Sequence, residues 1–287
     1  MQTALVACRL LHFWAVLMLF GLCFSHTLLA SSLERVASRP LSVRLTRWLC
    51  TLALLSALAW LLLIAASMAG SWVEGIEPDT LLLVLTHTAF GKVWIWHIGL
   101  NAALLTVLMR ASTPPTLLRV ALAFSLLATL APIGHVAMFD GLFGQLMIFN
   151  QLIHLCAVAT WLGGLGLLLS LLSRTAAADM RAVLLRFSGL GYVLVALIIA
   201  TGLINVRAMS GSLWPQPPFS GFGLILGVKA CMVLGMLALA LCNRLMLNRQ
   251  DLPIKVLRTS ILFESLFGIA ALLAVSLLGT LPPMQAG

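Results

Sequence analysis

The feature that constrains this chain most is a series of apolar runs, each about 20 residues or longer, that follow one another from end to end. As a helix rising about 1.5 Å per residue, such a run spans the roughly 30 Å hydrocarbon core of a bilayer. Strands of a membrane barrel would instead alternate apolar and polar residues over segments of about 10. The sequence therefore predicts an all-α, polytopic membrane helix bundle.

About eight transmembrane helices fit the chain. Apolar windows predict them at residues 4–30, 48–69, 80–109, 117–139, 146–173, 187–208, 220–247 and 257–280. Of the 287 residues, 62% are apolar and 9% are charged, so the polar surface is too small for a water-soluble protein. The connections between runs are short, and we expect residues 1–287 to form a single integral membrane domain embedded in the lipid bilayer.

The basic residues indicate how the bundle is oriented. Thirteen of the 17 Lys and Arg residues fall in alternate connections, and the connections between those carry none. The thirteen are Arg35, Arg39, Arg44, Arg47, Arg110, Arg119, Arg174, Arg181, Arg186, Arg244, Arg249, Lys255 and Arg258. The positive-inside rule places these connections in the cytoplasm and both termini outside. The net charge of +9 is thus a topology signal, and no nucleic-acid partner is expected.

All six histidines fall within the predicted helices, where ionisable groups are costly and usually mark a site or a pathway. Counting from the outer helix ends places His12 and His154 roughly 12 Å deep, His87 roughly 10 Å and His135 roughly 6 Å. Four helices thus offer imidazoles to one layer of the outer leaflet. For any single histidine, a hydrogen bond to a neighbouring helix is the structural alternative.

The two remaining histidines are expected outside this layer, while sulfur donors lie near it. His97 is expected near mid-membrane and His26 toward the cytoplasm, so both are predicted to lie outside the layer. Cys8 lies one turn from His12, and Met138 lies three residues after His135. Imidazole binds copper, iron and zinc, whereas Met and Cys sulfur favours Cu(I), so a metal site is one interpretation.

Charged side chains also occur inside the predicted spans. Arg9, Arg207 and Lys229 fall in the outer half, where they are expected either to pair with an anionic group or to snorkel to the interface. Glu264 lies about two turns into the last helix from the cytoplasm. A cation such as Arg244 or Arg186 would explain this acid structurally, and a proton relay is the functional alternative.

The second half contains a spaced set of short motifs. They are His154-x6-Trp161-Leu162-Gly163-Gly164, Arg186-Phe187-Ser188, Thr201-Gly202, Gly211-Ser212 with Trp214, Gly227-x-Lys229, Asn243-Arg244, Glu264 and Leu281-Pro282-Pro283. This set, over about residues 150–283, resembles the copper resistance protein D (CopD) family of bacterial inner-membrane proteins. The first half agrees through Arg9-x2-His12, Phe90-Gly91-x2-Trp94 and Gly134-His135.

The resemblance implies a multi-pass inner-membrane protein that handles or transports periplasmic copper, often beside a separate, small CopC-like copper-binding protein. Carried over by position, it implies His12, His135 and His154 as metal ligands. His87, Cys8 and Met138 are additional candidates. Arg9, Lys229 and Glu264 are the supporting polar groups, and the roles of His26 and His97 stay open.

Two functions remain open at this point. In the first, the histidines bind copper for homeostasis or transport. In the second, the protein is a b-type cytochrome, in which His12 and His154 ligate haem b and Arg9, Arg207 or Lys229 receives the propionates. Haem would make the protein an electron carrier with a role in copper redox chemistry. A purely structural subunit is a third reading, and an enzymatic activity is not the favoured one.

The topology is testable by cysteine labelling. A cysteine placed at Ser38, in the basic connection after the first helix, should be inaccessible to a thiol reagent confined to the periplasm, because that connection is predicted to face the cytoplasm. Labelling of Ser38→Cys in intact cells would overturn the orientation.

Overall fold

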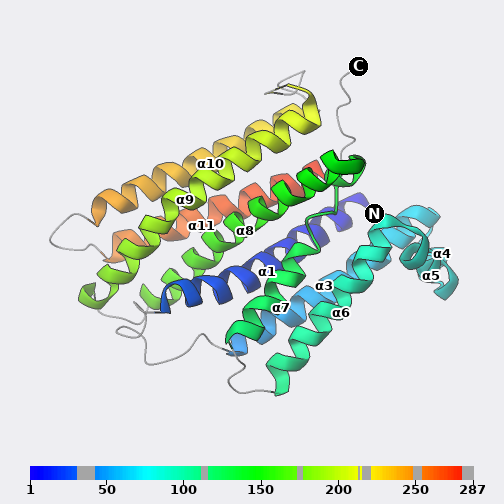
Figure 1. Ribbon diagram of the computed structural model, residues 1–287, viewed down its shortest axis with the longest axis horizontal. Coiled ribbons are helices and arrows are strands. Elements are labelled where there is room, and N and C mark those ends of the chain that lie inside the picture. Colours follow the sequence, from blue (N-terminus) through cyan, green and yellow to red (C-terminus); the bar gives the residue numbers. More distant parts are fainter. Residues whose placement is uncertain are drawn as a thin grey trace.

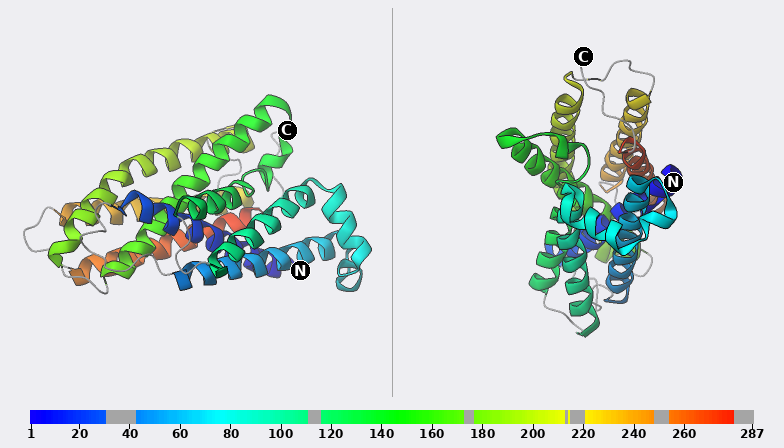
Figure 2. Two further views of the ribbon diagram at one scale, coloured as in Figure 1. Left: turned by 60° about the horizontal axis from the view of Figure 1, so that its bottom comes forward. Right: turned by 90° about the vertical axis from the view of Figure 1, so that its right-hand side faces the viewer.

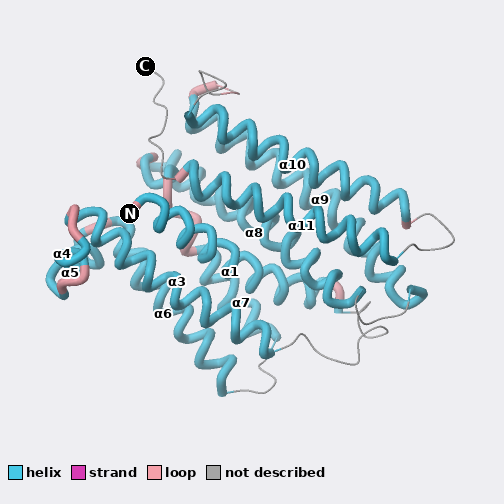
Figure 3. Tube along the Cα trace, turned by 180° about the vertical axis from the view of Figure 1, so that it is seen from behind, coloured by secondary structure: helices cyan, strands magenta, loops and turns pink. Residues whose placement is uncertain are grey.

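The computed structural model describes residues 1–30, 43–110, 116–172, 177–212, 214, 221–247 and 254–279, without the side chains of 177–179. Seven helices in these ranges are long and apolar enough to cross a membrane: α1 (Gln2–Leu28), α3 (Val43–Ala69), α6 (Ala89–Arg110), α8 (Gly141–Leu172), α9 (Ala177–Ser210), α10 (Gly221–Met246) and α11 (Ile254–Leu278). The shorter elements are α4 (Trp72–Gly75), α5 (Pro78–His87), α7 (Thr116–Ala128) and the 3-10 helix η1 (His135–Met138). The described part contains no strand (Figure 3), so the prediction of an all-α polytopic bundle is confirmed.

Helix α1 runs through the middle of the bundle (Figure 1), with α3, α6 and α7 on one side and α8 to α11 on the other. It packs against α8, α3, α7 and α11, while α10 pairs with α11 and α8 pairs with α9. Helices α4 and α5 lie beyond α3 and α6 at one end of the molecule (Figure 2). Both halves of the sequence thus contact α1, although a single domain over residues 1–287 stays a prediction.

The helix predicted at 80–109 is wrong as one continuous span. It is divided at Thr88, whose backbone is extended, into α5 and α6. The Thr88 hydroxyl oxygen accepts from the backbone N–H of Gly91 at 2.8 Å, which makes Thr88 the N-cap of α6. Gly91 also lets α5 approach closely, because a Cβ there would overlap the backbone of Val84 and Leu85. The membrane span therefore begins at Ala89 rather than near residue 80.

The helix predicted at 117–139 ends early as well. Helix α7 stops at Ala128, and its 13 residues, about 20 Å, are too few to cross the hydrocarbon alone. Pro132, which has no N–H to continue a helix, and Gly134, with φ of +92°, carry the chain through a turn into η1. The stretch after α7 returns the chain to the end where α8 begins (Figure 1), and seven of the described helices are long enough to cross the membrane on their own.

The two ends of the bundle differ in charge. The described basic residues of the alternate connections all lie in the helix turns at one end, and the first turn of α1 and the last turn of α11 lie at the other. Arg35, Arg39, Arg174, Arg249 and the labelling position Ser38 lie outside the described residues. The common end of α1 and α11 agrees with an even number of crossings. The side of the membrane that it faces stays a prediction.

Arginine side chains bind the carbonyl groups at the C-terminal ends of two helices. The last carbonyls of a helix have no partner within it, and a cation is favourable there. Arg47 Nε donates to Leu108 O of α6 at 2.7 Å, and Arg181 Nη2 donates to Leu247 O beyond α10 at 2.8 Å. Each arginine comes from a different helix than the end it caps, so these contacts also tie neighbouring helices together.

Helices α1 and α8 touch through their backbones. A Cβ on Gly163 would overlap the main chain at Gly21, and a Cβ on Gly21 would overlap the carbonyl of Ala159. Small residues at helix crossings allow this close approach in membranes. The next residue, Gly164, lies against the ring of Phe187 on α9. The two glycines of the Trp-Leu-Gly-Gly motif are thus packing positions.

A branched side chain at the crossing should disrupt it. Gly163→Val is expected to destabilise the protein by about 1–3 kcal/mol, because the backbones must separate to admit the side chain. Thermal unfolding in detergent measures the change. Gly99→Val is the matched control, since nothing lies within 4 Å of a Cβ at Gly99 on α6. Equal unfolding temperatures for the two variants would contradict the packing role.

Candidate functional site

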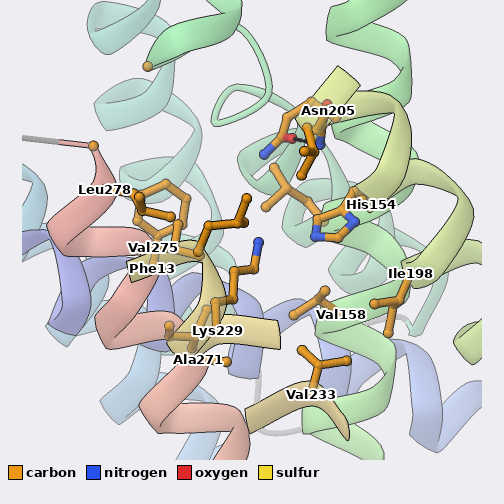
Figure 4. Close-up of a pocket in the computed structure, with 18 of the residues that line it drawn as sticks. Phe13, His154, Val158, Ile198, Asn205, Lys229, Val233, Ala271, Val275 and Leu278 are labelled. Carbon is orange, nitrogen blue, oxygen red and sulfur yellow. Dashed lines mark hydrogen bonds between the residues drawn. The ribbon is translucent and has the colours of Figure 1, made fainter. Parts of the chain in front are cut away.

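A cavity of about 200 Å³ opens between α1, α8, α9, α10 and α11 in the half of the bundle that carries both ends of the described chain. Among its lining residues are Arg9, His135, His154 and Lys229. Figure 4 shows His154 and Lys229 extending toward the middle of the cavity, with Leu278 and Phe13 on one side. The structure therefore brings four of the predicted site residues around one space.

The orientation of His154 is fixed by a threonine on the next helix. Its Nδ1 lies 2.8 Å from the hydroxyl oxygen of Thr201 on α9. That hydroxyl donates its single hydrogen to the Leu197 carbonyl at 2.5 Å, so it can only accept from the imidazole. His154 consequently carries its proton on Nδ1 and keeps the Nε2 lone pair available, as a metal-ligating histidine does.

Amide side chains between α8 and α9 continue this polar contact. Asn150 Nδ2 donates to Thr201 O at 3.1 Å and to Asn205 Oδ1 at 2.9 Å. Asn205 Nδ2 donates in turn to Gln151 Oε1 at 2.9 Å. Gln151 and Asn205 also line the cavity. The network holds the two helices in register behind His154.

His135 and Arg9 both bind the C-terminal end of α11. His135 Nε2–H donates to Leu278 O at 3.1 Å, and Arg9 Nη1 donates to Gly279 O at 2.8 Å. The Arg9 guanidinium also lies 5.3 Å from the centre of the Trp60 ring. Arg9 thus meets one backbone carbonyl and an aromatic face in place of the anionic group considered from the sequence. His135 lies in η1 rather than in a transmembrane helix, and only its Nδ1 is left for another ligand.

The two other predicted cations differ from each other. Lys229 is half-buried on α10, and its ammonium has no hydrogen-bond or ion-pair partner among the residues that the structure describes. Arg207 is exposed on α9 and does not line the cavity. Of the expected charge partners in the outer half, Lys229 is therefore the one that faces the cavity without a partner.

His12 lies in a different group of side chains. Its ring is 5.5 Å from Trp60, 5.4 Å from Trp94 and 4.9 Å from His97, between centroids, and it is absent from the lining of the His154 cavity. The expectation that His97 lies too deep to join His12 is wrong. Because α6 begins at Ala89, His97 is about 12 Å from the start of its helix, close to the roughly 15 Å that separate His12 from the start of α1.

The additional candidate ligands are scattered. His87 is exposed at the end of α5, and Met138 is exposed at the end of η1. Cys8 is half-buried near the His12 group, where its thiol donates to Ser56 O at 3.3 Å. In the described ranges, no three His, Cys, Asp or Glu side chains come together as a metal-binding group. A joint ligand set of His12, His135 and His154 is therefore not formed.

Axial ligation of haem b by His12 and His154 does not fit this geometry. The two imidazoles belong to separate groups, and three aromatic or imidazole rings within 5.5 Å of His12 occupy the room that a porphyrin would need.

Glu264 is satisfied by neutral donors. Its exposed fraction is 2%, and its two carboxylate oxygens accept from Trp161 Nε1 at 2.8 Å and from Asn243 Nδ2 at 3.0 Å. The expected ion pair with Arg244 or Arg186 is therefore replaced by hydrogen bonds from α8 and α10. A second cavity of about 230 Å³, toward the basic end, is lined by Glu264 and Asn243 and shares Trp161 with the first.

Sequence reasoning missed the hydroxyl groups that orient the histidines. Thr201 belongs to a motif noted in the sequence, but its role depends on which face of α9 meets α8. For His97, the available signal was Thr88, a residue type favoured as an N-cap, directly before the apolar run that starts α6.

Replacing the buried acid should loosen three helices. Glu264→Gln keeps the shape but exchanges one acceptor oxygen for a donor, which leaves either Trp161 or Asn243 without a partner. An unsatisfied buried donor costs about 1–3 kcal/mol, so thermal unfolding in detergent should shift downward. Ser265→Ala, which removes a half-buried bond within α11, is the control. If Glu264→Gln unfolds at the wild-type temperature, the structural role is refuted.

Comparison with known proteins identifies the family of this chain. A family model described as "Copper resistance protein D-like, N-terminal domain" matches residues 1–145, and one described as "Copper resistance protein D" matches residues 181–278. No solved structure matches.

Three curated relatives extend the match. Inner membrane protein YebZ of Escherichia coli (strain K12) is 30% identical, over 97% of this chain and 98% of that protein. Copper resistance protein D of Pseudomonas syringae pv. tomato is 27% identical, over 98% of each chain. Copper transport protein CutJ of Bacillus subtilis (strain 168) is 29% identical, over 76% of this chain and 41% of that protein. With seven helices able to span a membrane, the chain is a multi-pass inner-membrane protein and belongs to the copper resistance protein D family.

Proposed function

We propose that this protein handles copper in the outer half of the inner membrane, and that His154 is the copper ligand of the outer cavity. The observation that carries the proposal is the hydrogen bond from His154 Nδ1 to Thr201, which leaves Nε2 free at the cavity. A histidine that ligates a metal usually donates its other ring N–H to a fixed acceptor, and the Thr201 hydroxyl takes that place here.

Soft donors line the same cavity. Three thioethers, those of Met147, Met209 and Met236, share it with His154 and with the ring of His135. Thioether sulfur favours Cu(I) over harder divalent ions. The cavity therefore offers nitrogen and sulfur donors and no carboxylate from the described residues, a composition suited to a soft, monovalent ion.

The position of the cavity supports entry from the periplasmic side. Residues of η1 and of the last turn of α11 line its outer end, and the predicted orientation places this end toward the periplasm. A separate CopC-like copper-binding protein is the proposed donor. The second cavity shares Trp161, Val195 and Leu237 with the first and continues toward the basic end, which supports onward movement of copper through α8 to α11.

Copper binding should depend on His154 and on the hydroxyl behind it. In anaerobic Cu(I) titrations of the purified protein against a chromophoric chelator, His154→Ala should lose the cavity-bound ion. Thr201→Val, which keeps the shape and removes the hydroxyl, should weaken that binding about 10–100-fold. Lys229→Met should bind at least as tightly as the wild type, because a cation facing the ion is removed. Lys92→Met on exposed α6 surface is the control and should change nothing.

The same preparation distinguishes copper from haem. Under the proposal, the visible spectrum has no Soret band. A Soret band that disappears in Lys229→Met would instead support a haem whose propionate meets that lysine. Unchanged Cu(I) affinity in both His154→Ala and Thr201→Val would overturn the assignment of His154.

A further inference from the structure

A second pair of histidines lies apart from the outer cavity. His12 on α1 and His97 on α6 both have an exposed fraction of 0%, and their ring centroids are 4.9 Å apart. Trp94 stacks on His97 at 4.5 Å with an interplanar angle of 10°, and the rings of Trp60 and His12 form a T-shaped pair at 5.5 Å. The two imidazoles thus form one enclosed group between α1, α3 and α6.

The hydrogen bonds of His12 fix its tautomer. Its Nδ1 lies 2.9 Å from Ser56 Oγ, and that hydroxyl donates to the Leu52 carbonyl at 2.7 Å. A hydroxyl has a single hydrogen, so Ser56 must accept from the imidazole. The proton of His12 is therefore on Nδ1, and Nε2 carries a lone pair.

His97 repeats the arrangement on the other side. Its Nδ1 lies 2.6 Å from Thr129 Oγ1, which donates to the Leu126 carbonyl at 2.7 Å. The same counting places the proton of His97 on Nδ1. Each histidine is thus oriented by a hydroxyl group on a different helix or turn, and each presents Nε2.

Neither Nε2 atom has a hydrogen-bond partner within the described residues, although both are fully buried. The nearby side chains offer too few hydrogen-bond donors for these two acceptor atoms. Trp94 Nε1–H is used by the Ala57 carbonyl at 2.9 Å, which leaves the unpartnered indole N–H of Trp60 as the ring donor of this group. One donor cannot satisfy two acceptors, and a buried polar atom without a partner is costly.

The charge around the pair limits what it can bind. No carboxylate contacts either imidazole in the described structure. The charged group nearest in the contact network is Arg9, whose guanidinium lies over the Trp60 ring and donates to Gly279 O. A divalent ion held by two neutral ligands beside an arginine would be poorly compensated in a low-dielectric interior. A monovalent ion that accepts two ligands has the lowest electrostatic cost in this environment.

We propose that His12 and His97 form a buried two-nitrogen site for one Cu(I) ion, ligated through both Nε2 atoms. Two metal–imidazole bonds of about 2.0 Å each, in the near-linear arrangement of a two-coordinate ion, place the ring centroids roughly 6 Å apart, so binding the ion widens their separation from 4.9 Å by about 1 Å. Cu(I) accepts two-coordination and favours neutral nitrogen, whereas Zn(II) requires about four ligands. Both orienting hydroxyls supply the outer contacts expected of metal-bound histidines.

This site binds the same metal as the proposed His154 site, but it does not depend on His154. The two sites use different residues of α1, because Phe13 lines the outer cavity while the ring of the adjacent His12 meets Trp94 and His97 on α6. Their variants should therefore act independently, so one assignment can fail while the other stands.

Anaerobic Cu(I) titration of the purified full-length protein tests the pair. His12→Ala and His97→Ala should each lose one equivalent of Cu(I) per chain, and the double variant should lose no more than either single variant. His154→Ala should keep this equivalent. Thr129→Val, which preserves the shape beside His97, should weaken it about 10–100-fold. His26→Ala, also on α1, is the matched control and should bind as the wild type does.

X-ray absorption of the His154→Ala protein loaded with one Cu(I) adds a readout that does not depend on stability. Two nitrogen ligands and no sulfur are expected. Sulfur coordination would overturn the assignment, and so would an unchanged Cu(I) stoichiometry and affinity in His12→Ala and His97→Ala. Failure of the wild-type protein to bind a second equivalent would also overturn it, leaving the pair as a buried polar contact filled by water.

Discussion

Backbone contact between α1 and α8 at Gly21 and Gly163 is the constraint on which the rest of the bundle depends. It fixes α1 in the centre, where part of the helix surface meets α8 and α11 and the rest meets α3 and α7. Of two consecutive residues on α1, Phe13 consequently lines the cavity of His154, whereas the ring of His12 meets Trp94 and His97 on α6. The central position of α1 separates the His12 ring from the cavity of His154, and this is why these two histidines do not meet although they lie at similar depth.

The same hydrogen-bond arrangement orients histidines in both groups. In His12, His97 and His154, Nδ1 donates to a serine or threonine hydroxyl whose own hydrogen is bound by a helix carbonyl. Inside a membrane such a hydroxyl has no competing water, so it acts as a fixed acceptor and sets the tautomer of the ring. All three imidazoles are therefore oriented in advance with a lone pair on Nε2, the form required for a metal ligand.

The charged residues of the spans divide by what they contact. Arg9 is occupied by a helix-end carbonyl and an indole ring, and Glu264 accepts from Trp161 and Asn243, so both stabilise helix packing. Lys229 differs because it faces the outer cavity without a partner in the described part of the chain. It therefore sets the electrostatic character of that cavity, while the His12 and His97 group is almost purely aromatic and neutral.

The sequence by itself determined the membrane class, the approximate spans, the charge asymmetry of the two ends and the family, because hydrophobic length and loop charge are local properties. It also gathered His135, His154, Arg9 and Lys229 into one outer region. Only the tertiary structure decided which histidines are neighbours. Because Thr88 caps α6, His97 lies at about the same depth as His12. The orientation of α1 about its axis places the His12 ring beside His97 rather than beside His154. The depth of a residue in the membrane can be counted along its own helix. The neighbours of its side chain depend on how several helices pack, which no single segment encodes.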